Sequence, residues 1–183
     1  MVDVVDRITR SRMMAGIRAK DTKPELLLRH ALHRLGLRYR LHVSGLPGRP
    51  DIVMPRHNAV IEVRGCFWHR HAGCAYATMP ASNASFWSSK FSANVERDRR
   101  NCDALRAIGW KVAIVWECSI RNEGAETIAG KLGKWIASQR STAEFPVRPY
   151  AFGNVRKLPR AGAHDPDAKR RHSGKKESAR GSA

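Results

Sequence analysis

The feature that most limits the fold of this chain is a segment at residues 65–84 with no periodic pattern. It contains Gly, Pro, Cys and His, but neither the two-residue repeat of a strand nor the three-to-four-residue repeat of a helix. Loops this long inside a compact domain are uncommon, and they are usually functional or held by a cross-link. We therefore expect this segment to be ordered by a cross-link or to carry a functional site.

Regular patterns lie on both sides of the segment. A Thr22-x-x-Glu25 capping pattern precedes apolar residues at helical spacing, and short apolar runs between turn residues are typical of strands. The expected elements are a helix at 22–36, strands at 39–43, 51–54 and 59–63, a helix at 85–109, a strand at 110–117 and a helix at 127–137. This order predicts an α/β fold in which a central mixed β-sheet is flanked by α-helices.

Charge indicates the kind of partner. The 183 residues include 34 Lys and Arg against 16 Asp and Glu, a formal net charge of +18. This excess favours an anionic partner, with nucleic acid ahead of an acidic membrane surface. No apolar run approaches the roughly 18 residues that span a bilayer, and the first residues have no signal-peptide pattern. We expect a soluble intracellular protein whose four cysteines are thiols or metal ligands.

The composition divides the chain into three parts. We expect a basic amino-terminal segment at 1–20, the main folded domain at 21–140 and a carboxy-terminal extension at 141–183. After Leu158 the extension has no large aliphatic or aromatic residue, so it cannot bury enough surface to offset its ordering entropy. It should end in a disordered basic tail, which either binds phosphate groups or is a solvated tail of little consequence.

Candidate metal ligands come from three places in the chain. Asp98 lies on the apolar stripe of the long helix, where a carboxylate is costly unless it is paired or metal-bound. His71 and Cys74 form a His-x-x-Cys pair in the unpatterned segment, and Cys118 follows the fourth strand. These four would form a structural zinc site, although a neighbouring arginine could pair with Asp98 instead. Cys102, one turn from Asp98, is interpreted as a small buried hydrophobe.

Two further carboxylates lie at strand ends. Asp51 opens one strand of a predicted hairpin and Glu62 closes its partner, so both can meet at one end of the sheet. Carboxylate oxygens there suit Mg²⁺, which would position and polarise a phosphodiester. This pattern is typical of the restriction-endonuclease-like fold. The alternative is that both are ordinary turn and surface carboxylates.

Beside them is Cys66-Phe67-Trp68-His69, which puts two large aromatic residues and a histidine in an otherwise polar loop. In a basic protein, aromatic side chains can stack on bases or wedge between them. His69, if it lies near a bound water, could act as a general base. The alternative is that Phe67 and Trp68 anchor the loop in the core and that His69 binds a backbone carbonyl.

Several strings of residues, in order, resemble one family. They are Leu46-Pro-Gly-Arg-Pro-Asp51, Gly65-Cys-Phe-Trp-His-Arg-His71, Phe86-Trp87, Asn94-Val-Glu-Arg-Asp-Arg-Arg100, Gly109-Trp-Lys-Val and Val115-Trp-Glu-Cys118. Between about Arg7 and Trp135 the sequence resembles the very-short-patch-repair (Vsr) DNA mismatch endonucleases. The resemblance implies a restriction-endonuclease-like fold, Mg²⁺ for cleavage and a structural zinc.

The resemblance also implies a reaction. Its members nick one strand of double-stranded DNA 5′ of the T in a T·G mismatch, which arises from 5-methylcytosine deamination, and so initiate very short patch repair. Residues 21–140 would then be the endonuclease domain, and residues 1–20 would contact DNA. Repair synthesis by downstream proteins would follow in the bacterial cytoplasm, and a single-strand nick at an asymmetric lesion predicts a monomer.

Roles for single residues follow from the same resemblance. In the active site, Asp51 and the backbone carbonyl of Val63 would bind Mg²⁺, His69 would be the general base and Glu25 would take part. The zinc ligands would be His71, Cys74, Asp98 and Cys118. The expected DNA contacts are Met14, Phe67, Trp68, Trp87, Lys90 and Asn94.

One stretch departs from the family pattern. A well-known member has Phe-Thr-His where this chain has Glu62-Val63-Arg64. Glu62 could supply a second Mg²⁺ ligand, and Arg64 could stabilise the charge of the phosphorane. Two other functions remain open at this point: a module that binds T·G pairs without cutting, and a restriction endonuclease that cuts both strands of intact sites.

Overall fold

A five-stranded mixed sheet forms the centre of the protein. The computed structural model describes residues 20–146 and the single positions 6, 9, 16 and 148. The strands are β1 (Arg40–Leu41), β2 (Ile52–Met54), β3 (Ala59–Arg64), β4 (Lys111–Trp116) and β5 (Thr142–Phe145), in the spatial order β1-β2-β3-β4-β5. The β1–β2 and β2–β3 pairs are antiparallel, whereas β4 is parallel to both β3 and β5. The expected mixed sheet flanked by helices is confirmed.

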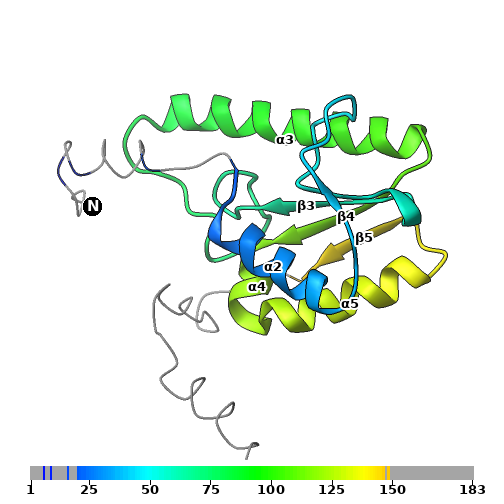
Figure 1. Ribbon diagram of the computed structural model, residues 1–183. Helices are drawn as coiled ribbons and strands as arrows, with labels where there is room; N and C mark the ends of the chain where they lie inside the picture. The colour runs from blue at the N-terminus through cyan, green and yellow to red at the C-terminus, as the bar shows by residue number, and fades with distance from the viewer. Residues whose placement is uncertain (1–5, 7–8, 10–15, 17–19, 147, 149–183) are drawn as a thin grey trace, which may run out of the picture.

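Helices cover both faces of this sheet. They are α2 (Lys23–Arg34), α3 (Ala84–Ala107), α4 (Glu117–Glu123) and α5 (Ala125–Ala137), with a 3-10 turn at Pro55–His57. Figure 1 shows α3 lying along one face, while α2, α4 and α5 lie together on the other. The long connection through α3 lets β4 return parallel to β3, since a parallel pair needs such a crossover.

The alternation of side chains along the strands divides the core into two layers. Ile52 and Met54 of β2 point to the larger cluster, which is formed with α2, α4 and α5. Val53 and Val60 point to the opposite face and pack with Leu105 of α3 in the smaller cluster. Each face of the sheet therefore has its own apolar layer, as expected for strands whose successive residues face opposite sides.

Two elements are absent from the sequence expectations, and one strand is shorter. Helix α4 begins directly after β4, and β5 extends the sheet to Phe145, beyond residue 140. The first strand was expected at 39–43 but contains only Arg40 and Leu41, because His42 adopts a φ of 46° that a strand cannot continue.

The start of α2 differs from a capping box. Thr22 is the N-cap residue, but its hydroxyl caps no backbone N–H and instead donates to Glu25 Oε1 at 2.8 Å. The N–H of Asp21 donates to the other oxygen of Glu25 at 3.1 Å. These bonds hold a carboxylate that is only 3% exposed at the end of the sheet where the candidate site lies.

Other expectations concern regions outside this body. Met14 and the basic tail lie outside the described residues. Within the described part of the chain, every helix is too short or too polar to cross a lipid bilayer.

Candidate active site and metal centre

Three cysteines and one histidine lie close together beyond the carboxyl ends of β3 and β4. Cys66, His71, Cys74 and Cys118 are all buried, and their ligand atoms lie within 4.8 Å of one another. His71 Nδ1 is 3.4 Å from Cys118 Sγ and 3.7 Å from Cys66 Sγ. Ligand atoms around a tetrahedral zinc are separated by about 3.5 Å. The cluster is therefore consistent with a structural zinc site, and its four protein ligands would fill the coordination sphere.

The thiols of this cluster support the same interpretation. Hydrogen bonds from Cys118 and His71 lower the pKa of Cys66 to about 5. The pKa of Cys118 is raised, chiefly by its hydrogen bond to Cys66, and burial raises that of Cys74. One thiolate thus forms readily, while the others resist ionisation in a buried site. A divalent cation would stabilise the thiolate of Cys66 and favour ionisation of the other two thiols, which is how metal binding is coupled to thiol deprotonation.

The zinc ligand set expected from sequence needs one correction. His71, Cys74 and Cys118 belong to the cluster, but the fourth member is Cys66 and not Asp98. Asp98 was correctly expected to be buried on α3, yet its carboxylate bonds to His69 and Arg97. The helix periodicity shows that Asp98 faces inward, but it does not show which neighbouring group satisfies its charge.

His69 and Asp98 form a hydrogen-bonded pair at the edge of the candidate site. Asp98 Oδ2 bonds to Nδ1 of the His69 ring. The backbone N–H of His69 donates to the carbonyl of Gly65 at 3.1 Å. Burial alone would raise the pKa of Asp98, but the bond to His69 and its charge lower it. A carboxylate bonded to Nδ1 fixes the orientation of the imidazole and leaves Nε2 for a second partner.

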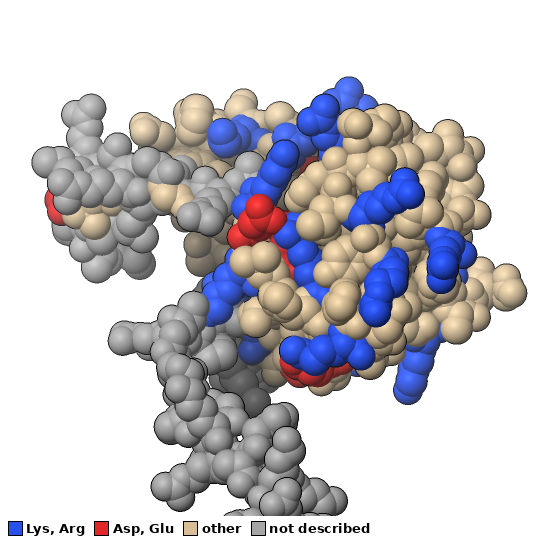
Figure 2. All heavy atoms as spheres, viewed as in Figure 1, with Lys and Arg blue, Asp and Glu red and all other residues tan. Residues whose placement is uncertain are grey.

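The carboxylates predicted at the sheet end share one cavity with this pair. Asp51, Glu25 and Glu62 line a cavity of about 790 Å³ together with His69 and Asp98. Cationic residues line it as well, namely Lys23, Arg49, Arg64, Lys90 and Arg97. Figure 2 shows that Lys and Arg side chains outnumber Asp and Glu over the visible face. A lining that mixes carboxylates with cationic side chains suits a site that binds a metal ion and a polyanion together.

Asp51 is the most electrostatically perturbed carboxylate of this cavity. Its pKa is raised to about 7, first by burial and then by the charges of Glu25 and Glu62. The N–H of Val63 donates to Asp51 Oδ2 at 2.7 Å and opposes this shift. Ionised Asp51 therefore lacks compensating positive charge, which a divalent cation would supply. It is the N–H of Val63 that meets Asp51 in this structure; the role predicted for its carbonyl stays a prediction.

Glu62 and Arg64 bind each other. Nε of Arg64 donates to Glu62 Oε2 at 2.9 Å, and both side chains lie on the face of β3 that α3 covers. Cys102 of α3 contacts the pair, since its Sγ is 3.1 Å from Nη2 of Arg64. Cys102 is thus half-buried, and it packs against the smaller apolar cluster as well as beside these charged groups. The interpretation of Cys102 as a small buried hydrophobe is confirmed in part.

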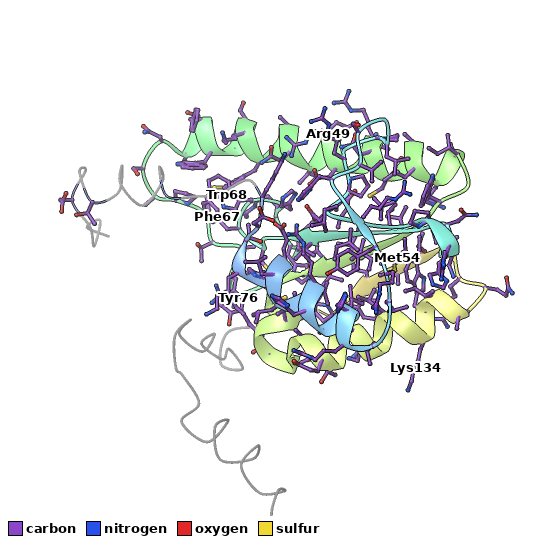
Figure 3. The ribbon with its side chains drawn as sticks, viewed as in Figure 1. Arg49, Met54, Phe67, Trp68, Tyr76 and Lys134 are labelled. Atoms are coloured by element: carbon purple, nitrogen blue, oxygen red, sulfur yellow. The ribbon has the colours of Figure 1, made fainter. Side chains whose placement is uncertain are left out.

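The aromatic residues of the loop pack into one cluster. Figure 3 shows Phe67 and Trp68 side by side below the amino-terminal half of α3. Phe67 makes edge contacts with Trp68, Trp87 and Phe91 at centroid separations of 5.0, 5.7 and 5.1 Å. Phe91 is buried, whereas Phe67, Trp68 and Trp87 are half-buried and Phe86 is 58% exposed. The cluster therefore anchors the loop and still presents aromatic surface.

Two other expected DNA contacts lie next to this cluster. The side-chain amide of Asn94 donates to the carbonyl of Trp68 at 3.1 Å, so Asn94 holds the aromatic loop against α3. Lys90 is exposed and lines the cavity, with its ammonium group 5.9 Å from the ring of Phe86. Structure thus adds a loop-supporting bond for Asn94, and the DNA contacts of both residues stay predictions.

Comparisons with known proteins show what this chain is similar to. A family profile described as DNA mismatch endonuclease Vsr matches residues 2–75. The DNA mismatch endonuclease Vsr of Escherichia coli strain K12 is 41% identical over 151 residues, which cover 81% of this chain and 96% of that relative. The type II nicking enzyme V.XorIIP of Xanthomonas oryzae pv. oryzae is 46% identical over 125 residues, 68% of this chain and 91% of that relative.

A third relative extends the same pattern. The type II nicking enzyme V.NmeAIP of Neisseria meningitidis is 42% identical over 123 residues, 67% of this chain and 87% of that relative. Taken together, the buried carboxylates at a sheet end and these relatives define a DNA endonuclease with a restriction-endonuclease-like fold. The chain belongs to the Vsr DNA mismatch endonuclease family, as its sequence motifs indicate.

The corrected ligand set gives a direct prediction. Cys66→Ser should lower the zinc content of the purified protein well below one per chain, because it removes a ligand of the closed cluster. Asp98→Asn should keep one zinc per chain. Inductively coupled plasma mass spectrometry measures both. Cys102→Ser is the matched control, since it changes a cysteine outside the cluster; loss of zinc from Asp98→Asn with retention in Cys66→Ser would contradict the assignment.

The raised pKa of Asp51 predicts a dependence of stability on pH. Between about pH 4 and 7 the folded state holds a proton at Asp51 that the unfolded state has released, so stability falls as the pH rises. Without added Mg²⁺, Asp51→Asn should therefore raise the melting temperature at pH 8. The corresponding gain in the free energy of unfolding is at most about 4 kcal/mol. The difference should disappear near pH 4.

Thermal unfolding followed by circular dichroism tests this. Asp103→Asn provides the control, because Asp103 is an exposed carboxylate on the same side of the sheet. The idea is wrong if Asp51→Asn is no more stable than wild type at pH 8.

Proposed function

We propose that the protein nicks one strand of double-stranded DNA 5′ of the T in T·G mismatches that arise from 5-methylcytosine deamination, and so initiates very short patch repair. The observation that carries this proposal is the single cavity that brings Asp51, Glu25 and Glu62 together with His69. The names of the relatives, a mismatch endonuclease and nicking enzymes, support a single-strand cut.

Asp51 is the proposed Mg²⁺ ligand, with Glu62 and the carbonyl of Val63 as further ligands and Glu25 beside them. Two observations support this assignment: the cavity offers carboxylate oxygens as ligands, and the largely buried Asp51 has no ion pair with a lysine or arginine among the described residues. Bound there, Mg²⁺ would supply positive charge to the phosphodiester and lower the barrier to its hydrolysis.

His69 is the proposed general base. Its Nε2 would take a proton from the attacking water, while Asp98 on Nδ1 holds the ring and stabilises the imidazolium that forms. The water oxygen forms a bond to phosphorus as one phosphate–oxygen bond of the strand breaks, and the leaving oxygen acquires a proton. A pure DNA-binding module would gain nothing from this pair or from carboxylates placed beside a phosphate.

Arg64 is proposed to stabilise charge at the phosphorane. Its bonds to Glu62 and Cys102 fix the guanidinium before DNA arrives, so less ordering is needed when the substrate binds. The pair thus takes the place of the residues that a well-known family member carries at these positions.

The aromatic cluster is proposed to wedge into the duplex beside the mismatch. Phe67, Trp68 and Trp87 are already packed together, and their exposed edges lie next to the cavity that Trp68 helps to line. Lys90 and Asn94 would contact the DNA backbone from α3, and Met14 from the amino-terminal segment. One active site suffices for one nick, so we propose a monomer that hands the nicked strand to downstream repair proteins.

A cleavage assay tests the function. An end-labelled duplex with one T·G pair in a CTWGG-type site should be nicked once, 5′ of the mismatched T, when Mg²⁺ is present. The fully paired duplex should be cut at least about 100-fold more slowly. Asp51→Asn should abolish nicking with DNA affinity retained, because it removes the principal metal ligand, whereas Asp103→Asn should cut like wild type.

The other outcomes distinguish the alternatives. Cleavage of both strands of the paired duplex would support a restriction endonuclease and exclude strict mismatch dependence. Tight T·G-selective binding with no cleavage in any divalent metal would indicate a binding module.

The His69–Asp98 pair gives a second prediction. His69→Ala should lower the single-turnover nicking rate by about 100-fold or more, the usual contribution of a general base. Asp98→Asn should lower it by at least about tenfold, because the ring loses its anionic partner. Both variants should bind mismatched DNA as tightly as wild type in a fluorescence-anisotropy titration. Glu96→Gln, which changes an exposed carboxylate of α3 two residues before Asp98, is the control. An unchanged rate for His69→Ala would remove His69 from the reaction.

A further inference from the structure

We propose that Arg29 is a positioning residue of the nuclease site, which holds Glu25 directly and acts on Asp51 through His42. This inference rests on the proposed function, since it assumes that Asp51 binds the catalytic metal ion. Arg29 lies on α2, and no sequence motif draws attention to it.

The two Nη atoms of Arg29 contact three neighbouring side chains, while its buried Nε has no hydrogen-bond partner among the described residues. Nη2 donates to Glu25 Oε2 at 2.8 Å and lies 3.1 Å from Nε2 of His42, while Nη1 bonds to Asp21. Its side chain is 6% exposed. On the backbone side, the Arg29 carbonyl accepts a hydrogen bond from the Tyr39 hydroxyl at 2.9 Å. One guanidinium therefore links the helix to the segments before it and after it.

The link continues to Asp51. The other ring nitrogen of His42, Nδ1, lies 3.9 Å from Oδ1 of Asp51, while Asp51 Oδ2 accepts the Val63 N–H. The two oxygens of Asp51 thus face two different neighbours. The ring of His42 lies beside the carboxylate oxygen that the strand does not bond, at a distance beyond a direct hydrogen bond, and Arg29 contacts the far side of that ring.

Backbone conformation adds a second observation. Asp21 and His42, two of the residues that Arg29 contacts, have φ values of 55° and 46°. A side chain other than glycine adopts this left-handed region at a cost and keeps it only where the surroundings enforce it. The bonds to Arg29 are such an enforcing contact. Without them both residues would gain freedom to leave the conformations that direct their side chains toward the site.

Charge explains why an arginine is suited to this place. Glu25 and Glu62 flank Asp51 in the cavity, and each is paired with an arginine, Arg29 and Arg64 respectively. Among the described residues, Asp51 forms no ion pair with a lysine or arginine. The two arginines offset part of the charge of the flanking carboxylates, and Asp51, which has no such partner, stays available for a metal ion.

Two other roles for this cluster fit less well. Asp21, Glu25 and His42 are close enough together to hold a metal ion, but the guanidinium of Arg29 already bonds to all three. A direct DNA contact is disfavoured because the side chain of Arg29 is buried. Positioning is the role that uses every observed contact.

Single-turnover nicking of the T·G duplex tests the inference, with Mg²⁺ titrated and DNA saturating. We expect Arg29→Met to lower the rate at saturating Mg²⁺ by at least about tenfold and to raise the half-saturating Mg²⁺ concentration. The dissociation constant for DNA should stay within about twofold of wild type. Arg29→Lys should give an intermediate rate, because an ammonium keeps the charge but not the fork of donors.

A control separates positioning from stability. Leu32→Ala truncates a fully buried side chain of the same helix, in the core away from the site. For this variant and for Arg29→Met, the fraction of active molecules is measured by titration with DNA. Leu32→Ala should lose melting temperature but keep the rate per active molecule. A rate for Arg29→Met within twofold of wild type, or a loss that Leu32→Ala reproduces, would overturn the inference.

Asp51→Asn, measured in parallel, separates this inference from the function on which it rests. If Asp51→Asn nicks like wild type, the proposed catalytic site is wrong and the inference falls with it. If Asp51→Asn is inactive while Arg29→Met nicks at the wild-type rate, only the role of Arg29 is wrong.

Discussion

The Cys66–His71–Cys74–Cys118 cluster is the constraint on which the rest of the site depends. Three of its members come from the segment after β3, and the fourth is the second residue of α4, which follows β4. The cluster therefore ties an otherwise unpatterned stretch to the two parallel strands at the centre of the sheet. Phe67, Trp68 and His69 lie between Cys66 and His71. The residues that fix the loop therefore also fix these three residues, which are proposed to act on DNA.

Much of the fold follows from local sequence patterns. Where an element could not be predicted from such a pattern, there is a physical reason. The strands around Val53, Val60 and Val112 are apolar runs, and the helices carry apolar stripes, so their existence could be predicted from spacing. Helix α4 begins immediately after β4 with no turn signal between them. Strand β5 is a short edge strand with an exposed–intermediate alternation, and only its pairing with β4 defines it.

The site was predictable in composition but not in its pairings. Sequence reasoning placed Asp51 and Glu62 at one end of the sheet, and both line the cavity. It chose Asp98 as a zinc ligand because a buried carboxylate needs a partner, but it could not see that His69 is that partner. Cys66 was overlooked among its aromatic neighbours. The signal was its position, since Cys66, His71 and Cys74 place three residues with metal-binding side chains, two of them sulfur ligands, within nine consecutive positions.

The parallel pairing of β3 with β4 also limits when the protein can fold during its synthesis. Ala59 lies beside Lys111 in that pair, so two strands separated by the whole of α3 must meet before the sheet is continuous. Contacts between residues so distant in sequence form late, because a large loop has to close first. The ligand Cys118 is made later still. A nascent chain that already contains every proposed catalytic residue therefore has neither a finished sheet nor a fixed loop, and it becomes a competent nuclease only after nearly the whole domain has left the ribosome.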